Sequence, residues 1–373
     1  MADSPPEFDS LVREGFGVKD TFQLEDGEME YRVTYAPDSK QKFKELCAEL
    51  QPKGYTPWLT GSEEDCVLLV KKKQPPRPSV SRIPVLMALF TVASVVVYGI
   101  FEVLSYAKFA PVIPNYVVLL SFCACILAIL VAHEFGHRYV AEMRGTSAPV
   151  PYIVPGIPAI TAFLPTIGIV STQREAAVNR DSIFDIAIAG PLAALGVTLV
   201  LSILGAFASV QSVLPLSGNQ QINAFLTVGQ VNPGILQMAL DSGLSPFLRQ
   251  IAPNLARLSP VSDATAIGFF LTFVTLLPMS FFDGGYLASA VLGDRGVRAA
   301  TYLSILLLLA LDTPNYWAPA FLTLLIASRQ QRLQLLDEVS KPAGTRRLIL
   351  ILAVVLALLC VPIPQNFATF PLP

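Results

Sequence analysis

Beyond residue 82 the chain is built from long apolar runs with few charges, and these runs constrain its fold more than any other feature. About 20 helical residues cross the roughly 30 Å of hydrocarbon in a bilayer, so each run predicts a transmembrane helix. With 53% hydrophobic and only 14% charged residues, the chain is too apolar for a soluble protein of 373 residues. We therefore expect a mainly α fold, a polytopic transmembrane helical bundle. Its six or seven spans are expected at residues 84–105, 116–143, 183–209, 264–292, 297–311, 315–328 and 346–362.

A polar segment precedes the apolar body, because 27 of the 54 charged residues lie before Ile83. Residues 19–36 alternate around a charged turn, residues 38–50 have helical spacing, and residues 66–70 are an apolar run typical of a strand. This pattern predicts a small α+β domain. A basic, proline-rich stretch at residues 71–78 is typical of a linker that runs to a membrane surface. We expect two domains, an N-terminal α+β domain with its basic linker at residues 1–82 and a transmembrane domain at residues 83–373.

Basic residues beside the spans fall on one side of the bundle if the chain alternates across the membrane. They are the Lys71 to Arg82 cluster, Arg138, Arg144, Arg174, Arg180, Arg295, Arg298, Arg329, Arg332, Arg346 and Arg347. The positive-inside rule makes that side cytoplasmic and places the loop at residues 210–262 outside. The acidic start of the chain lacks the order of a secretory signal, so we expect a cytoplasmic N-terminus in the plasma (inner) membrane of a prokaryote. A net charge of −2 and the lack of a phosphate-binding loop in the sequence argue against nucleic acid as a partner.

One apolar stretch, residues 149–172, does not fit a helix. It contains Pro149, Pro151, Pro155, Pro158 and Pro165, and proline removes backbone donors and disfavours helix. Non-helical backbone at membrane depth is tolerated only where it is buried in protein or lines a cavity. We therefore expect a re-entrant extended segment near an active site; the alternative is a proline-rich surface loop.

The chemistry concentrates at His133-Glu134-Phe-Gly-His137, an HExxH pattern inside a predicted span. Histidines at i and i+4 lie on one face of a helix, so both imidazoles reach one zinc ion, with Glu134 beside them as a base. These are the only two histidines of the chain, and they follow an uncharged run. Ionisable groups at membrane depth usually serve a function. The alternative is that both histidines only hydrogen-bond neighbouring helices.

A catalytic zinc ion usually has three protein ligands and one open position. Asp283 is our third ligand, because residues 264–282 carry no charge and Gly284 and Gly285 let the backbone bend close to a neighbour. The competitor is Asp185, which we instead expect at an interfacial helix start, where a carboxylate suits the helix dipole.

Three motifs in this order resemble the site-2 protease family of intramembrane metalloproteases. They are HEFGH at 133–137, AGP at Ala189-Gly190-Pro191, and LLPxxxxDGG at Leu276–Gly285, and the resemblance covers residues of about 116–292, the expected catalytic core. The polar head is similar to that of prokaryotic and chloroplast members without a PDZ domain. The resemblance implies one Zn²⁺ per chain held by His133, His137 and Asp283, with Glu134 as general base. The chain departs from the family at Thr275, where Asn is common, and at Phe281, where Pro is common.

The expected activity is therefore that of a zinc metalloendopeptidase acting within the membrane. Its expected partners are the lipid bilayer and membrane-protein substrates with a transmembrane helix. We assign a further role in substrate binding or backbone support to Gly168, Thr275, Gly284 and Gly285. Two other hypotheses are a catalytically silent membrane scaffold and an ion carrier that uses the same three ligands.

Overall fold

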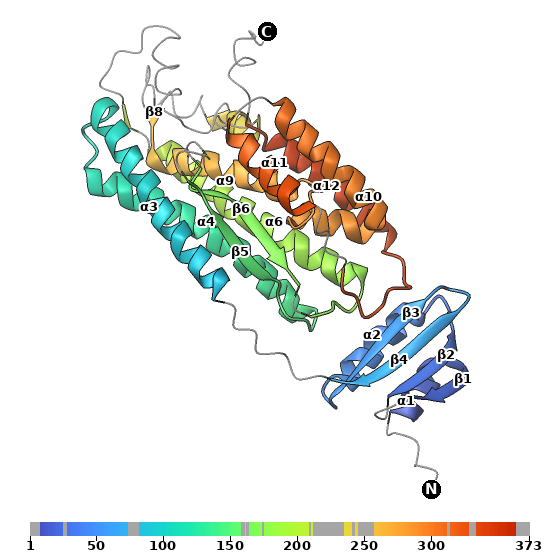
Figure 1. The fold of residues 1–373 in the computed structure, drawn as a ribbon. Coiled ribbons are helices and arrows are strands. Elements are labelled where there is room, and N and C mark those ends of the chain that lie inside the picture. The colour runs from blue at the N-terminus through green and yellow to red at the C-terminus, as the bar shows by residue number, and fades with distance from the viewer. Residues whose placement is uncertain are drawn as a thin grey trace.

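The fold is described from a computed structural model of the chain (Figure 1). The description covers residues 8–24, 28–73, 82–157, 161, 164–173, 175–208, 210–211, 235–240, 243–244, 257–311, 314–327 and 333–362. Arg174, Arg329, Arg332 and most of the 210–262 loop, which entered the topology prediction, lie outside these residues.

The N-terminal head, residues 8–73, is a small α+β unit. Its antiparallel sheet has the strand order β1-β2-β4-β3. The elements are α1 Asp9–Gly15, β1 Gly17–Gln23, β2 Met29–Thr34, α2 Ser39–Leu50, β3 Tyr55–Gly61 and β4 Cys66–Lys72. Alternate residues of β4 are buried, as expected for a sheet with one face on a core. The expected helix at 38–50 and strand at 66–70 are thus present, whereas α1 and β3 had not been expected.

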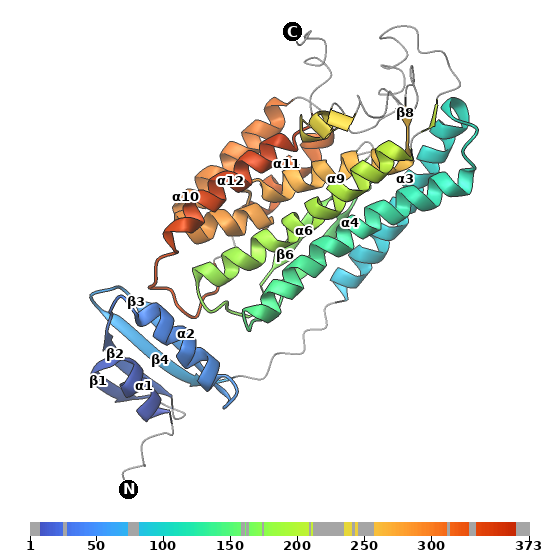
Figure 2. The ribbon, with the colours of Figure 1, turned by 180° about the vertical axis from the view of Figure 1, so that it is seen from behind.

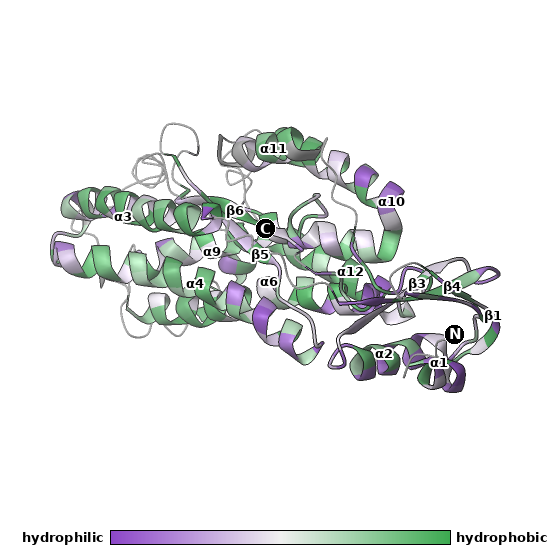
Figure 3. Ribbon diagram, turned by 60° about the horizontal axis from the view of Figure 1, so that its bottom comes forward, coloured by the Kyte–Doolittle hydropathy of each residue, from purple (hydrophilic) through white to green (hydrophobic). Residues whose placement is uncertain are grey.

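The body contains three helices that are long and apolar enough to cross a membrane, within the part of the chain that is described. They are α3 Ile83–Phe109, α4 Asn115–Met143 and α6 Arg180–Phe207, and they coincide with the first three predicted spans. Figure 3 shows mostly apolar residues along α3 and α4, and hydrophilic residues on the head, on α10 and at the end of the body near the head. The chain is therefore a membrane protein.

The longer helices further along the chain do not confirm a count of six or seven spans. They are α9 Pro260–Leu276, α10 Asp283–Ala310, α11 Pro314–Ala327 and α12 Gly344–Leu359, and two short strands, β7 Val210–Gln211 and β8 Arg257–Leu258, pair near α9. The helix α10 bends at Gly293, whose backbone is not helical (φ 71°, ψ −176°).

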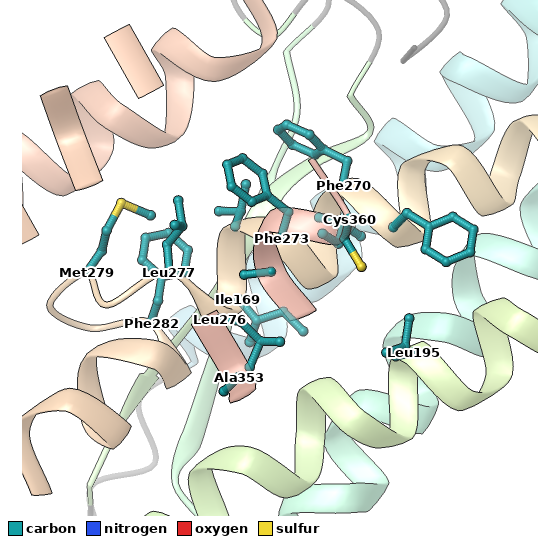
Figure 4. Packing of buried hydrophobic residues seen from close by; sticks show 14 of the residues in the cluster. Ile169, Leu195, Phe270, Phe273, Leu276, Leu277, Met279, Phe282, Ala353 and Cys360 are labelled. Atoms are coloured by element: carbon teal, nitrogen blue, oxygen red, sulfur yellow. The ribbon is translucent and has the colours of Figure 1, made fainter. Parts of the chain in front are cut away.

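The predicted continuous span at 264–292 is wrong, because the chain leaves the helix between α9 and α10. Proline disfavours helical backbone in the residue before it, and Leu277, which precedes Pro278, is extended (φ −60°, ψ 138°). Phe281 then adopts a positive φ of 73°, and α10 begins at Asp283. Figure 4 shows Leu277, Met279 and Phe282 of this break packed beside α9 and α12. The break therefore places Asp283 at the start of a helix inside the core.

The proline-containing segment forms a β-hairpin, as the sequence predicts. Strands β5 Val150–Pro155 and β6 Thr166–Thr172 pair antiparallel, with Val154 opposite Gly168. Side chains of α3 hold its turn, since Ser94 Oγ donates to the Gly156 carbonyl at 2.8 Å. The hairpin crosses the face of the bundle between α3 and α9 (Figure 1).

The head is joined to the body by more than its linker. A connector, residues 333–340, runs between α11 and α12 and pairs with two partners. On one side Leu59 N–H of β3 donates to the Leu336 carbonyl at 2.7 Å, and on the other Leu336 N–H donates to the Ala177 carbonyl at 2.8 Å. Leu336 and Val178 are buried in the same apolar cluster as the head's own core residues. The hydrophobic core of the head thus extends beyond residues 1–82.

Candidate metal centre

Three predicted ligands that are distant in the sequence meet in the middle of the body. Helix α4 supplies His133 and His137, and Asp283 is the first residue of α10. All three are buried, with 3%, 2% and 1% of their surface exposed. One ligand atom from each lies within 4.8 Å of the others, and this is the one such group of His, Cys, Asp or Glu among the residues described.

The separations fit the ligand set of one metal ion. Nε2 of His133 lies 3.0 Å from Oδ2 of Asp283, and Nε2 of His137 lies 3.2 Å from Oδ1. The two Nε2 atoms are 3.1 Å apart. Two ligands of a tetrahedral zinc ion with bonds of 2.0–2.1 Å are about 3.3 Å apart. Asp283 Oδ2 accepts no hydrogen bond from a described residue, although Nε2 of His133 is close.

A backbone carbonyl of α6 fixes the orientation of His137. Nδ1 of the ring lies 2.8 Å from the Ile186 carbonyl oxygen, which can only accept, so Nδ1 carries the proton. Nε2 of the neutral ring then presents a lone pair toward Asp283, which is the state that binds a metal. A cation between these atoms would compensate the lone pair of His137 and the negative charge of Asp283.

The glycine of the AGP step makes room for this ring. A Cβ atom on Gly190 would lie 2.2 Å from His137 Nε2, far inside any real contact. On the facing helix, a Cβ atom on Gly136 would lie 2.4 Å from the Ala189 carbonyl oxygen. Close packing of α4 and α6 at these two glycines therefore brings the Ile186 carbonyl within reach of the imidazole.

Glu134 lies beside the ligands without belonging to the set. Its side chain is 14% exposed, and it forms a long ion pair with Arg138, whose Nε is 3.6 Å from Oε2. Oε2 is buried and accepts no hydrogen bond from a described residue. A buried carboxylate oxygen without a donor is available to receive a proton, which suits a general base.

The other predicted site residues lie nearby in supporting positions. Thr275 is buried, donates to the Thr272 carbonyl at 3.3 Å, and lines a small cavity together with His133. Gly168 has a φ of 145°, and a Cβ atom there would lie 2.8 Å from the ring of Phe282, next to Asp283. Both therefore adjoin the centre without contributing a ligand.

Gly284 and Gly285 let the backbone approach a neighbour closely, and that neighbour is the preceding segment of the chain. A Cβ atom on Gly284 would lie 2.2 Å from the Leu276 and Leu277 carbonyl oxygens, and one on Gly285 would lie 2.1 Å from that of Met279. The two glycines thus let α10 begin directly against the preceding break.

The competing ligand, Asp185, lies outside the cluster. Its carboxylate forms ion pairs with Arg144 and with Arg346, the latter at 2.6 Å. Helix α6 is instead capped by Asn179, whose side chain accepts from Ser182 N–H at 2.9 Å. The contact between the Ile186 carbonyl and His137 could not be predicted, because a backbone group has no signature in the sequence.

Comparison with known proteins agrees with this centre. The family model described as Peptidase family M50, the site-2 protease family, matches residues 121–311. The chain belongs to this family. Related proteins include two from Arabidopsis thaliana, the probable chloroplastic zinc metalloproteases EGY2 and EGY1. Both are 26% identical to this chain, EGY2 over 246 residues and EGY1 over 241 residues. EGY1 of Oryza sativa subsp. japonica is 27% identical over 237 residues.

These alignments cover 63–64% of this chain but only 39–41% of each relative. The chain thus spans about two fifths of the length of the relatives it matches. No solved structure matches it significantly.

Proposed function

We propose that this chain is an intramembrane zinc metalloprotease that hydrolyses peptide bonds in or next to transmembrane segments of membrane proteins. The observation that carries the proposal is the convergence of His133, His137 and Asp283 inside an apolar bundle. Beside them lies Oε2 of Glu134, a buried carboxylate oxygen that accepts no hydrogen bond from a described residue. Membership of the family and the names of the related proteins, which are probable zinc metalloproteases, support the same activity.

Each residue of the centre has its own role in the proposed reaction. His133, His137 and Asp283 would hold the metal, and the chemistry that zinc supplies when bound is Lewis-acid activation of a water molecule. Glu134 takes a proton from the attacking water at Oε2 and later delivers it to the amine of the leaving peptide. Thr275 of α9 lines a small cavity together with His133, and the break before Asp283 sets where α10 and its first residue begin.

The substrate must change conformation before it reacts. A transmembrane helix keeps its carbonyls in i to i−4 hydrogen bonds, so the segment to be cut has to unwind locally. The proposed substrates are therefore membrane proteins whose helices contain residues that weaken helix, such as glycine and proline. In keeping with the distribution of basic residues, we place the N-terminus and the head in the cytoplasm of a prokaryotic cell, at its plasma membrane.

The test is Glu134→Gln, which removes the base but no ligand. The purified variant should hold as much zinc as the wild type and should not cleave a membrane-protein substrate in detergent or vesicles. Glu142→Gln is the matched control, because Glu142 is an exposed carboxylate on the same helix. Full cleavage by Glu134→Gln would refute the proposed mechanism. A wild-type chain that binds zinc but cuts no membrane protein would instead favour the scaffold or carrier hypothesis.

A further inference from the structure

Asp185 is a nearly buried carboxylate of the body that the proposed mechanism does not use. Its side chain is 11% exposed, yet it lies between cations from two other helices. Arg346, in the first turn of α12, reaches it with both terminal nitrogens, Nη1 to Oδ1 at 2.6 Å and Nη2 to Oδ2 at 2.9 Å. Two parallel charged hydrogen bonds of this kind fix both the distance and the rotation of their partners.

A second cation ties the same carboxylate to α4. Arg144, the residue that ends α4, pairs with Oδ2 of Asp185. The end of α4 and the starts of α6 and α12 all lie at the end of the bundle that faces the head (Figure 2). Asp185 therefore joins three helices at one point.

Further contacts hold Arg346 in place. Its guanidinium carbon lies 5.4 Å from the centre of the buried Phe184 ring, and its Nε is 3.7 Å from Asp181. Asp181 in turn accepts from the Ala343 N–H at 3.0 Å and pairs with Lys40 of the head at 2.6 Å. The cluster is thus a continuous network of charged groups from the head to the start of α6.

The network ends at Asp185, one residue before the backbone carbonyl that contacts His137. Ile186 follows Asp185, and its carbonyl is the group that orients His137. Because Gly190, one turn further on, packs directly against the same imidazole, a shift or rotation of the first turns of α6 would displace the ring. Outer groups that orient a metal ligand commonly affect metal affinity by about 10- to 100-fold.

We propose that Asp185 is a positioning residue for the metal centre, which locks α6 to α4 and α12 so that the Ile186 carbonyl holds His137 in its ligand orientation. The inference rests on the proposed function, since it assumes that His137 binds zinc. The charged cluster at the head-facing end of the bundle neither holds the metal nor acts as the base. The proposal gives this cluster a role in metal binding.

The test measures metal binding directly. Asp185→Asn keeps the size of the side chain and removes its charge, and it should weaken zinc binding about tenfold or more in competition with a chelator. With cobalt in place of zinc, its visible absorption spectrum should differ from that of the wild type, because the ligand geometry has changed. Cleavage should recover as free zinc is raised, which a variant lacking a ligand would not show to the same degree.

Two further variants separate positioning from loss of folding. Arg346→Lys keeps the charge but cannot form the paired hydrogen bonds, so it should fall between the wild type and Arg346→Met. Asp185→Asn combined with Arg346→Met should lose little more than either alone, as expected for two groups of one interaction. Lys341→Met is the control, since its ion pair with Glu63 is exposed (80% and 49%) and contacts neither α4 nor α6.

The outcomes are distinct for the two proposals. If Asp185→Asn has wild-type zinc affinity and an unchanged cobalt spectrum, the positioning role is wrong. If Asp185→Asn does not fold, Arg346→Lys takes its place, and wild-type zinc affinity in that variant would overturn the proposal. A wild-type chain that binds no zinc would instead refute the proposed function itself.

Discussion

Gly190→Ala is the substitution whose effect the structure defines most sharply. The new Cβ atom would lie 2.2 Å from Nε2 of His137 and 2.5 Å from Cε1. Ordinary van der Waals contact begins at 3.4 Å, so the ring would have to move by about 1.2 Å. Metal ligands keep their distances within about 0.2 Å, so a displacement of this size takes His137 out of the ligand set.

Movement of α6 instead of the ring would not rescue the centre. The Ile186 carbonyl would then withdraw from Nδ1, from its present 2.8 Å, and the orientation of the imidazole would be lost. Either way we expect zinc affinity to fall by at least about 100-fold, the upper end of the range for losing an outer hydrogen-bond partner. The assay is chelator competition on purified protein in detergent, together with zinc content per chain and cleavage.

Gly196→Ala provides a matched control on the same helix. A Cβ atom there meets nothing within 4 Å, so the added methyl group has open space. Both substitutions raise helix propensity equally, by up to about 1 kcal/mol, so a difference between them reports the contact with His137 alone. Equal zinc affinity in the two variants would refute the packing of α6 on the imidazole.

Three other predictions follow from separate parts of the structure. Asp283→Asn should lower zinc content by removing an anionic ligand, and Asp283→Ala should lower it further. Asp185→Ala should keep more zinc than either variant. If metal analysis shows the reverse order, the ligand assignment is wrong. In the head, burial and then the nearby Asp337 and Asp65 raise the pKa of the Cys66 thiol to about 11. At pH 8 iodoacetamide should therefore modify Cys66 far more slowly in the native than in the unfolded chain, and similar rates would show that the site is open. Leu336→Ala should destabilise the docked head by about 2–5 kcal/mol, because Leu336 is 3% exposed in its core; unchanged thermal unfolding of the head would count against that docking.

The three residues of the candidate centre can be found in the sequence because their signals are carried by side chains. His133 and His137 are the only histidines, and Asp283 is an isolated charge in an apolar region, so each residue is conspicuous without a structure. The non-helical hairpin is predicted for a similar reason, since prolines mark it in the sequence. The structure brings the three ligands together across 146 residues, which sequence spacing alone cannot show.

Other features depend on contacts that leave no local trace. Hydropathy does not distinguish one span at 264–292 from two helices, and only Pro278 indicates the break. Asp185 was expected to complement a helix dipole, but its main partner is Arg346, 161 residues away. The pairing of Leu59 with the connector was likewise hidden, because a polar loop between two apolar helices gives no sign of its partner.

The connector has a consequence for how the protein is made. Residues 8–73 leave the ribosome before the body does, and Leu336, which covers the β3 edge at Leu59, follows 277 positions after Leu59. At about 5–20 residues per second, that edge stays uncovered for roughly 14 to 55 s while the helices of the body are inserted. An open strand edge invites pairing with other chains. The nascent head is therefore most exposed to aggregation, or to a chaperone that recognises strand edges, in the interval that ends when the connector reaches it.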